Sequence, residues 1–239
     1  MRVARPLVTA EIIAVGSELL GSTRVDTNSL FLSERLASLG IELRAKSVVG
    51  DDRSRLEAIL RGALSRAELV ILTGGLGPTD DDLTREVVAG TLGLPLREDP
   101  AILAQIQERF AARGLRMPHV NRKQAMVPKG AAVLENPRGT APGLSIEHDG
   151  RSVVLLPGPP REMQPMFDEL CAATLARRAG GARIHKAMLF VAGRGESQVE
   201  EIAQPIYSKW LRETPPIETT ILAMPGQVEL HLKIGRAHV

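Results

Sequence analysis

The chain has 239 residues, 44% of them hydrophobic and 24% charged, which is typical of a globular protein with one large core or two small ones. A formal net charge of +2 gives no strong attraction to nucleic acid or membranes, and an aromatic content of 3% removes most stacking platforms for single strands. The single cysteine, Cys171, excludes an intrachain disulfide and a metal site built from cysteines alone.

Residues 1–9 are interpreted as a short N-terminal extension, because their apolar run is too short for a signal peptide and leads directly into a strand. No run of about 18 apolar residues follows, so no segment is expected to span a bilayer. We therefore expect a cytoplasmic protein without membrane association, and we expect it to form a homodimer.

Residues 10–178 alternate apolar strand patterns with amphipathic helix patterns. Strands are predicted at 10–16, 41–50 and 68–75, and helices at 26–39, 51–67, 84–94 and 99–114. Thr84 is the expected N-cap of the third helix, and Asp51 or Asp52 that of the second. This alternation predicts a parallel sheet covered by helices on both faces.

After Pro118 the pattern changes to a predicted β-hairpin with its turn at Asp149–Gly150, followed by a helix from Pro160 to about Arg178. Cys171 lies in this helix as an expected buried, inert thiol. Residues 179–182 are interpreted as a linker. Beyond it, a small second domain over residues 183–239 is predicted from strand, helix, strand and strand patterns at 186–193, 196–211, 217–225 and 227–235.

Unusual residues follow the predicted strands, at the sheet edge where ligands bind in parallel sheets. The segment LTGGLGPTDDDLT places Gly74, Gly75 and Gly77 beside three consecutive aspartates. Backbone N–H groups bared by glycine can hold phosphate oxygens, and an aspartate can hold a divalent cation that bridges to phosphate. From the pattern alone, a solvated turn with helix-capping acids explains these residues about equally well.

Other segments supply further polar groups. Glu18, Asp26 and Asn28 could bind a ribose or a second metal, although helix capping is the favoured interpretation of the latter two. The segment LPGPPREM opens a helix, and is either an anion site or a stiff turn with proline at the first helical position. The candidate substrate-binding residues are Gly16, Glu18, Asp26, Asn28, Gly74, Gly75, Gly77, Thr84, Asn136, Gly139, Thr140, Pro157 and Gly158.

Several site types are disfavoured by the motifs that the chain lacks. The scattered histidines show no zinc-site spacing, and no GxSxG nucleophile motif occurs. The GRGE segment at 193–196 is only faintly similar to the GXXG loop of KH modules, and a simple strand–helix turn is favoured there.

The motifs AVGSELLGSTRVDTNS, VVGDD, TGGLGPTDDDLT, NPRGTAPG and LPGPPREM, in this order, resemble the CinA family of competence/damage-inducible proteins over residues 10–178. The later segments GRGES and MPGQVELHLK are similar to that family's KH-like middle domain. The resemblance implies the α/β class, with a three-layer, parallel-sheet molybdopterin-binding-like domain that includes a β-hairpin. A small α/β KH-like domain would follow it, over residues 183–239.

For activity, the resemblance implies hydrolysis of a nucleotide diphosphate, ADP-ribose, to AMP and ribose 5-phosphate, with Mg²⁺, Mn²⁺ or Co²⁺ as the divalent metal ion. It assigns the catalytic and metal-binding roles to Asp82 and Asp51, and it leaves the contributions of Asp80 and Asp81 open. The deamidase domain of many members is not expected in this chain, which stops at Val239.

The alternative is a module that binds molybdopterin or a nucleotide without turnover. The triple aspartate favours hydrolysis, because a module that only binds an anionic ligand gains little from added negative charge. We also expect removal of the Asp82 carboxylate to leave the stability of the fold unchanged, since repulsion between neighbouring acids opposes folding.

Overall fold

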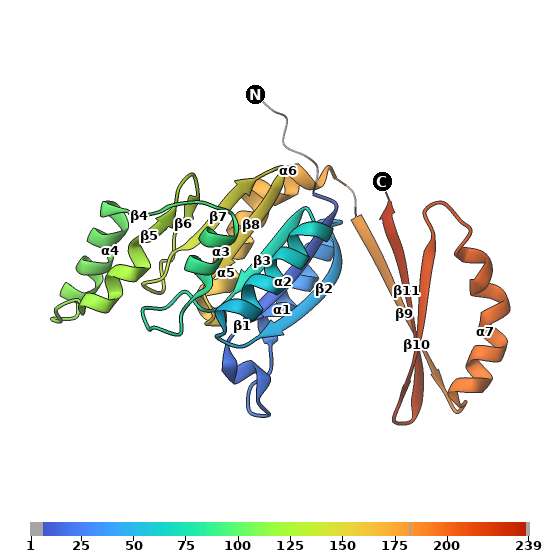
Figure 1. The fold of residues 1–239 in the computed structure, drawn as a ribbon. Coiled ribbons are helices and arrows are strands. Elements are labelled where there is room, and N and C mark those ends of the chain that lie inside the picture. The colour runs from blue at the N-terminus through green and yellow to red at the C-terminus, as the bar shows by residue number, and fades with distance from the viewer. Residues whose placement is uncertain (1–6, 182, 238–239) are drawn as a thin grey trace.

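The structure, a computed structural model, describes residues 7–181 and 183–237. Residues 7–181 form a layered α/β unit, and residues 183–237 form a three-stranded sheet with one helix (Figure 1). Most of the predicted N-terminal extension, one residue of the predicted linker and the last two residues lie outside the described residues.

The first unit is built around a six-stranded sheet with the order β2-β1-β3-β8-β7-β6. Its strands are β1 (Thr9–Val15), β2 (Glu42–Val49), β3 (Leu69–Thr73), β6 (Ala132–Leu134), β7 (Gly143–His148) and β8 (Arg151–Leu156). The first three strands and β8 are mutually parallel, whereas β7 and β6 run antiparallel to their neighbours. The hairpin β7–β8 forms as predicted, and because it joins the main sheet the sheet is mixed rather than wholly parallel.

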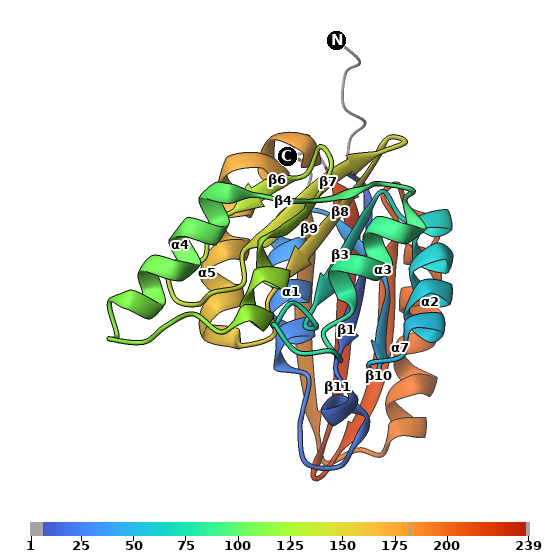
Figure 2. The ribbon, with the colours of Figure 1, turned by 60° about the vertical axis from the view of Figure 1, so that its left-hand side comes forward.

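Helices cover both faces of this sheet, which gives the three layers that the sequence predicted. On one face lie α1 (Thr27–Ser38) and α5 (Pro160–Leu170), and on the other α2 (Arg53–Arg66) and α3 (Thr84–Thr91) (Figure 2). Successive side chains of a strand point to opposite faces, so Ile12 packs in the first core and Ile13 in the second. Strands β1 and β3 are buried along their whole length as a result.

Helix boundaries agree with the predicted caps except at α3. The side chains of Asp26 and Asp52 accept hydrogen bonds from Ser29 N and Arg55 N, and so cap α1 and α2. The predicted N-cap at Thr84 is wrong, because the residue in that position is Leu83 and no side chain caps the helix. Thr84 Oγ1 instead donates to the carbonyl oxygen of Gly74 at 2.8 Å.

A small subdomain that the sequence only partly predicted lies at the edge of the sheet. It consists of β4 (Leu96–Glu98), α4 (Pro100–Ala111), the 3-10 helix η2 (His119–Ala125) and β5 (Met126–Pro128). Strands β4 and β5 pair with each other, and Ile102, Ile106 and Ala125 form a separate small core. The subdomain brings one face of α4 toward the end of the main sheet.

The remaining helical turns close the first unit. A 3-10 helix, η1 (Ser17–Leu20), follows β1, and α5 continues through a π-helical turn, η3 (Cys171–Leu175), into α6 (Ala176–Ala179). The predicted helix to about Arg178 is therefore present but interrupted. Cys171 is buried, as expected.

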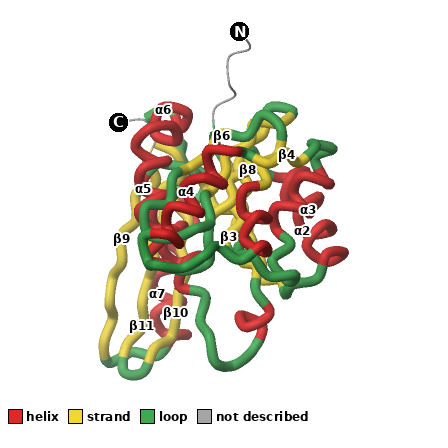
Figure 3. The backbone as a smooth tube through the Cα atoms, turned by 90° about the vertical axis from the view of Figure 1, so that its left-hand side faces the viewer, coloured by secondary structure: helices red, strands yellow, loops and turns green. Residues whose placement is uncertain are grey.

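The second unit shows the predicted order of strand, helix, strand and strand. Strands β9 (Arg183–Ala192), β11 (Gln227–Ala237) and β10 (Ile217–Met224) form an antiparallel sheet, with α7 (Glu196–Trp210) alongside (Figure 3). Its core is small: among the described residues, the buried members are Val199, Val228 and Leu230. No helix in the described part of the chain is long and apolar enough to cross a membrane.

Candidate functional site

A cleft of about 750 Å³ lies where β1, β3 and β8 end. This volume is within the range of about 300–1,000 Å³ typical of small-molecule sites. Every candidate residue from the sequence lines it except Thr84 and Asn136. A ligand-sized cleft thus lies at the carboxyl ends of the parallel strands, where the strand–helix alternation predicted a ligand site.

The glycine turn after β3 crosses the ends of the neighbouring strands at very short range. Gly74 has φ 101°, and a Cβ there would lie 2.1 Å from the carbonyl oxygen of Val15 in β1. Gly74 N also donates to the carbonyl oxygen of Leu156, the last residue of β8. Glycine is therefore required by both conformation and space, and the turn holds the ends of three strands together.

Thr84 holds this turn by two hydrogen bonds and does not line the cleft. Its side chain is fully buried, its hydroxyl donates to Gly74 O, and its backbone N–H donates to Gly75 O at 3.1 Å. A Cβ on Gly75, which has φ 66°, would lie 2.2 Å from Thr84 Oγ1. The sequence predicted a substrate contact for Thr84, whereas the structure places it behind the turn.

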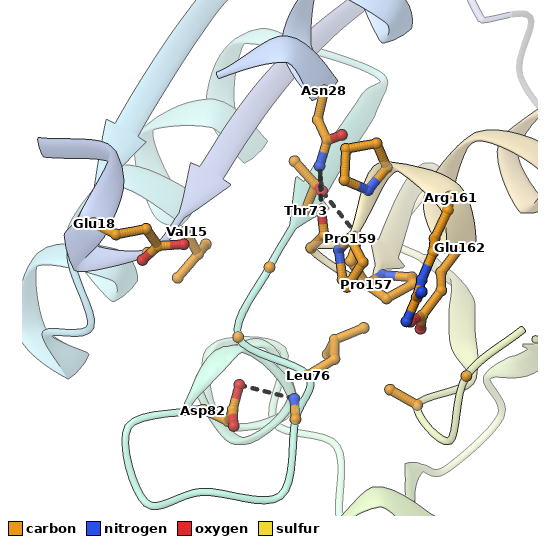
Figure 4. A pocket seen from close by; sticks show the side chains of 18 of the residues that line it. Val15, Glu18, Asn28, Thr73, Leu76, Asp82, Pro157, Pro159, Arg161 and Glu162 are labelled. Atoms are coloured by element: carbon orange, nitrogen blue, oxygen red, sulfur yellow. Dashed lines mark hydrogen bonds and ion pairs between the residues drawn. The ribbon is translucent and has the colours of Figure 1, made fainter. Parts of the chain in front are cut away.

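Asp82 closes the loop that continues from the glycine turn (Figure 4). Its Oδ1 accepts from Gly77 N at 2.8 Å, and its Oδ2 accepts from Thr79 N at 2.9 Å and from Thr79 Oγ1 at 2.6 Å. A carboxylate has about four lone-pair sites, so Asp82 retains acceptor capacity for a cation. These three bonds do not fit the expectation that its charge can be removed without a structural cost.

Asp51 joins the ends of β1 and β2. Its Oδ2 accepts from Ser17 N at 2.8 Å, and its own N–H donates to Ser17 Oγ at 3.0 Å. Asp51 and Asp82 line the same cleft, Asp51 from the end of β2 and Asp82 from the loop before α3. Among the described residues, no three acidic, histidine or cysteine side chains gather closely enough to hold a metal ion by themselves.

Asn28 connects α1 to the floor of the cleft. Its Nδ2 donates to Thr73 Oγ1 at 3.0 Å and to Gly158 O at 2.7 Å, and Thr73 Oγ1 donates to Pro157 O at 3.2 Å (Figure 4). These residues come from α1, β3 and the segment after β8. Part of the polar character of this wall is therefore structural, because the bonds hold the three segments together.

The side chain of Asn136 is hydrogen-bonded to its own loop and to Glu162 of α5. Its Oδ1 accepts from the backbone N–H groups of Arg138 and Gly139, and its Nδ2 donates to Ala141 O and to Glu162 Oε2 at 2.8 Å each. Its side chain thus makes four hydrogen bonds to protein, and it does not line the cleft. Asn136 shapes the loop that presents Gly139 and Thr140.

The sequence interpretation missed the arginines of the cleft, which come from four separate segments: Arg24, Arg109, Arg113, Arg138 and Arg161. They oppose a comparable set of acids: Glu18, Asp26, Asp51, Asp81, Asp82 and Glu162. Arginine pairs with phosphate through charge-assisted, bidentate hydrogen bonds. The cleft therefore offers cationic groups for an anion and carboxylates for a cation, and Arg161 and Glu162 lie side by side on one wall (Figure 4).

One further arginine lies beneath the loop rather than in the cleft. Arg85 is fully buried, and its Nη2 donates to Leu76 O at 3.3 Å, whereas Nε and Nη1 have no hydrogen-bond partner among the described residues. Burial lowers the pKa of its guanidinium, and the charges of Glu86 and Asp82 act in the opposite direction. The loop is thus held between a buried cation and the Asp82 carboxylate.

In comparisons with known proteins, residues 11–177 match the family described as "Probable molybdopterin binding domain". The CinA-like proteins of Koribacter versatilis and Solibacter usitatus are 47% and 46% identical over 228 and 224 residues. The matches cover 94% of this chain in both cases, and 54% and 53% of those proteins. The chain therefore spans about half the length of these curated relatives.

Among solved structures, CinA from Thermoplasma acidophilum, described as a protein of unknown function, is similar at 37% sequence identity with a TM-score of 0.64. The match covers 69% of this chain and 96% of that one.

Proposed function

The chain belongs to the CinA-like family, with a probable molybdopterin binding domain, and from this premise we propose that it hydrolyses a nucleotide diphosphate with a divalent cation. ADP-ribose is the proposed substrate, and AMP and ribose 5-phosphate are the products. One observation supports this most: a single cleft brings together the backbone of the glycine turn, the carboxylates of Asp51 and Asp82 from two separate loops, and several arginines.

The residues fit a cation that is completed by its substrate. Mg²⁺ is usually held by one or two carboxylates together with substrate phosphates and water, and Asp51 and Asp82 supply two carboxylates to one cleft. When bound, such a cation polarises a phosphoryl oxygen and lowers the pKa of a bound water. Mn²⁺ and Co²⁺ are the other candidates.

The protein's own groups have separate tasks in this proposal. The arginines orient the diphosphate and offset its negative charge. Gly74 N and Gly77 N already donate within the protein, so the glycine turn contributes close approach of the ligand to the backbone. The ties from Asn28 and Asn136 keep the two walls of the cleft in place. Fixed donors of this kind lower the barrier by positioning, because little reorganisation is needed during reaction.

The second candidate function is binding of molybdopterin or a nucleotide without turnover. It is favoured by the three hydrogen bonds that Asp82 already accepts within its loop. A carboxylate with three such bonds can serve only to stabilise the loop conformation, without binding a cation. The two functions share the cleft and differ in whether the bound diphosphate is cleaved.

The direct test is to incubate the purified protein with ADP-ribose and Mg²⁺, Mn²⁺ or Co²⁺, and to separate the products by chromatography. We expect AMP and ribose 5-phosphate in equal amounts, and no product after the cation is chelated. Binding of ADP-ribose without product would favour the second function. Absence of both binding and product would count against either use of the cleft.

Matched variants separate the roles of the aspartates. We expect Asp51→Asn and Asp82→Asn to lower turnover by about a hundredfold or more, as is usual for positioned catalytic groups. Asp80→Asn is the control, since Asp80 is exposed and does not line the cleft. Equal losses in all three variants, or normal turnover in Asp51→Asn, would show that these carboxylates do not hold the cation.

A further inference from the structure

A second cavity of about 380 Å³ lies beside the cleft, between α4 and residues 133–142. Arg109, Gly139 and Thr140 line both spaces. The two spaces therefore adjoin each other at these three residues.

The chemistry of the second cavity differs from that of the cleft. Its walls include Ile102 and Ile106, which are 5% and 2% exposed, together with Pro137 and Pro142. Glu108 and Glu135, which are both exposed, also line it, whereas the glycine turn of the cleft does not. Apolar walls with acidic neighbours disfavour a phosphate and suit a flat, uncharged ring.

The wall of this cavity is already ordered. Asn136 makes four side-chain hydrogen bonds within the segment and to Glu162, and the flanking prolines have fixed φ angles. A ring that enters such a cavity orders few additional protein groups, so less of the contact energy is lost to conformational entropy.

Arg109 stands at the junction of the two spaces. Its Nη2 donates to Asn136 O at 2.8 Å, which ties the guanidinium to the wall of the second cavity. A guanidinium can stack its flat face on an aromatic ring and direct its edge toward a phosphate. Arg109 is therefore suited to contact both parts of a nucleotide.

We propose that the second cavity binds the nucleobase of the ligand whose phosphates lie in the cleft, with Arg109 between base and phosphates. This assignment rests on the proposed function for the presence of a nucleotide, and it adds where the base is bound. It does not depend on whether the diphosphate is cleaved.

The test compares two probes by titration calorimetry, AMP and inorganic pyrophosphate, with a variant that fills the cavity. Val133→Trp places an aromatic ring in the second cavity, and Val48→Trp is the control, since both valines are 39% exposed and lie in strands. Val48 lines neither space. We expect Val133→Trp to weaken AMP binding by about tenfold or more while pyrophosphate binding stays unchanged. Val48→Trp should leave both affinities unchanged.

Other outcomes overturn the assignment in distinguishable ways. If Val133→Trp binds AMP as tightly as wild type, or loses both probes equally, the base does not lie in this cavity. If wild type binds pyrophosphate and not AMP, the cavity contributes nothing to binding. If wild type binds neither probe, the proposed function itself fails. Ala112→Phe fills the same cavity from the end of α4 and replaces Val133→Trp if that variant does not fold.

Discussion

At the scale of single residues, the charged groups around the cleft differ in role more than in type. Asp82 and Asp51 are both carboxylates that line the cleft, yet Asp82 accepts three hydrogen bonds within one loop and Asp51 joins two strands. Arg85 is fully buried whereas Arg109 reaches the cleft. Position in the fold, rather than residue type, therefore decides which charges are available to a ligand.

Cys171 gives a prediction that depends on a single buried thiol. Burial raises the pKa of Cys171 from 9.0 to about 12, the Asp168 charge adds to this rise, and Arg35 opposes it. The thiolate is the reactive form, so we expect the native thiol to react with a disulfide reagent at pH 8 on the order of a hundredfold more slowly than the unfolded chain.

The sign of the associated pH effect follows from the raised pKa. The folded state disfavours the thiolate, so this contribution to stability is complete below pH 9 and is lost as pH rises toward 12. Reaction rates can be followed by absorbance in buffer and in guanidinium chloride, with Cys171→Ser as the blank. Equal rates in the two conditions would mean that Cys171 is accessible in the folded protein.

At the scale of elements, the unit that builds the site is strand β3, its glycine turn and helix α3. The turn can cross the ends of β1 and β8 only because Gly74 lacks a side chain. Thr84, at the start of α3, then bonds back to the turn. The cleft floor is thus set by how closely these backbones approach.

Two glycines with the same φ of 66° separate conformational strain from close packing. Gly93 has no atom within 4 Å of a built Cβ, whereas a Cβ on Gly75 would lie 2.2 Å from Thr84 Oγ1. We expect Gly93→Ala to cost about 1–2 kcal/mol, the price of a left-handed backbone, and Gly75→Ala about 1–3 kcal/mol more through overpacking. Urea unfolding measures the free energy of unfolding of both variants. Equal losses of stability would show that the Thr84 side chain can move away from the added methyl group without destabilising the fold.

At the scale of the whole molecule, the chain consists of two units with very different cores. The first unit has two large clusters of buried residues, one on each face of its main sheet, and the small core of its subdomain. Among the described residues, the second unit has three in its buried core. Of the residues that the structure describes, those that line the cleft and the second cavity all belong to the first unit. The KH-like character of the second unit and the homodimer stay predictions, and light scattering of the purified protein measures the oligomeric state.

The difference in cores predicts that the first unit folds by itself. We expect limited proteolysis to cut within residues 179–182, and we expect a fragment of residues 1–181 to unfold cooperatively within a few degrees of the full chain. Calorimetry of the fragment checks this, and its AMP affinity should equal that of the full chain. Preferential cutting within residues 56–72, or a fragment that does not fold, would contradict the division into two units.

The sequence by itself determined the α/β class, the main strands and helices, and the position of the cleft. These follow from local physics: hydrophobic periodicity, glycine turns and capping aspartates each involve a few neighbouring residues. The short strands β4, β5 and β6 have too few residues to show a period, so pairing with partners elsewhere in the chain established them.

Only the tertiary structure decided the roles of Thr84, Asn136 and the arginines. The bond from Asn28 to Gly158 spans 130 positions, and that from Arg109 to Asn136 spans 27. Contacts at such separations depend on how the elements pack, and a single sequence does not display that packing. Whether a polar side chain contacts a ligand or holds a loop is therefore decided by the fold, because the same hydrogen-bonding groups serve both purposes.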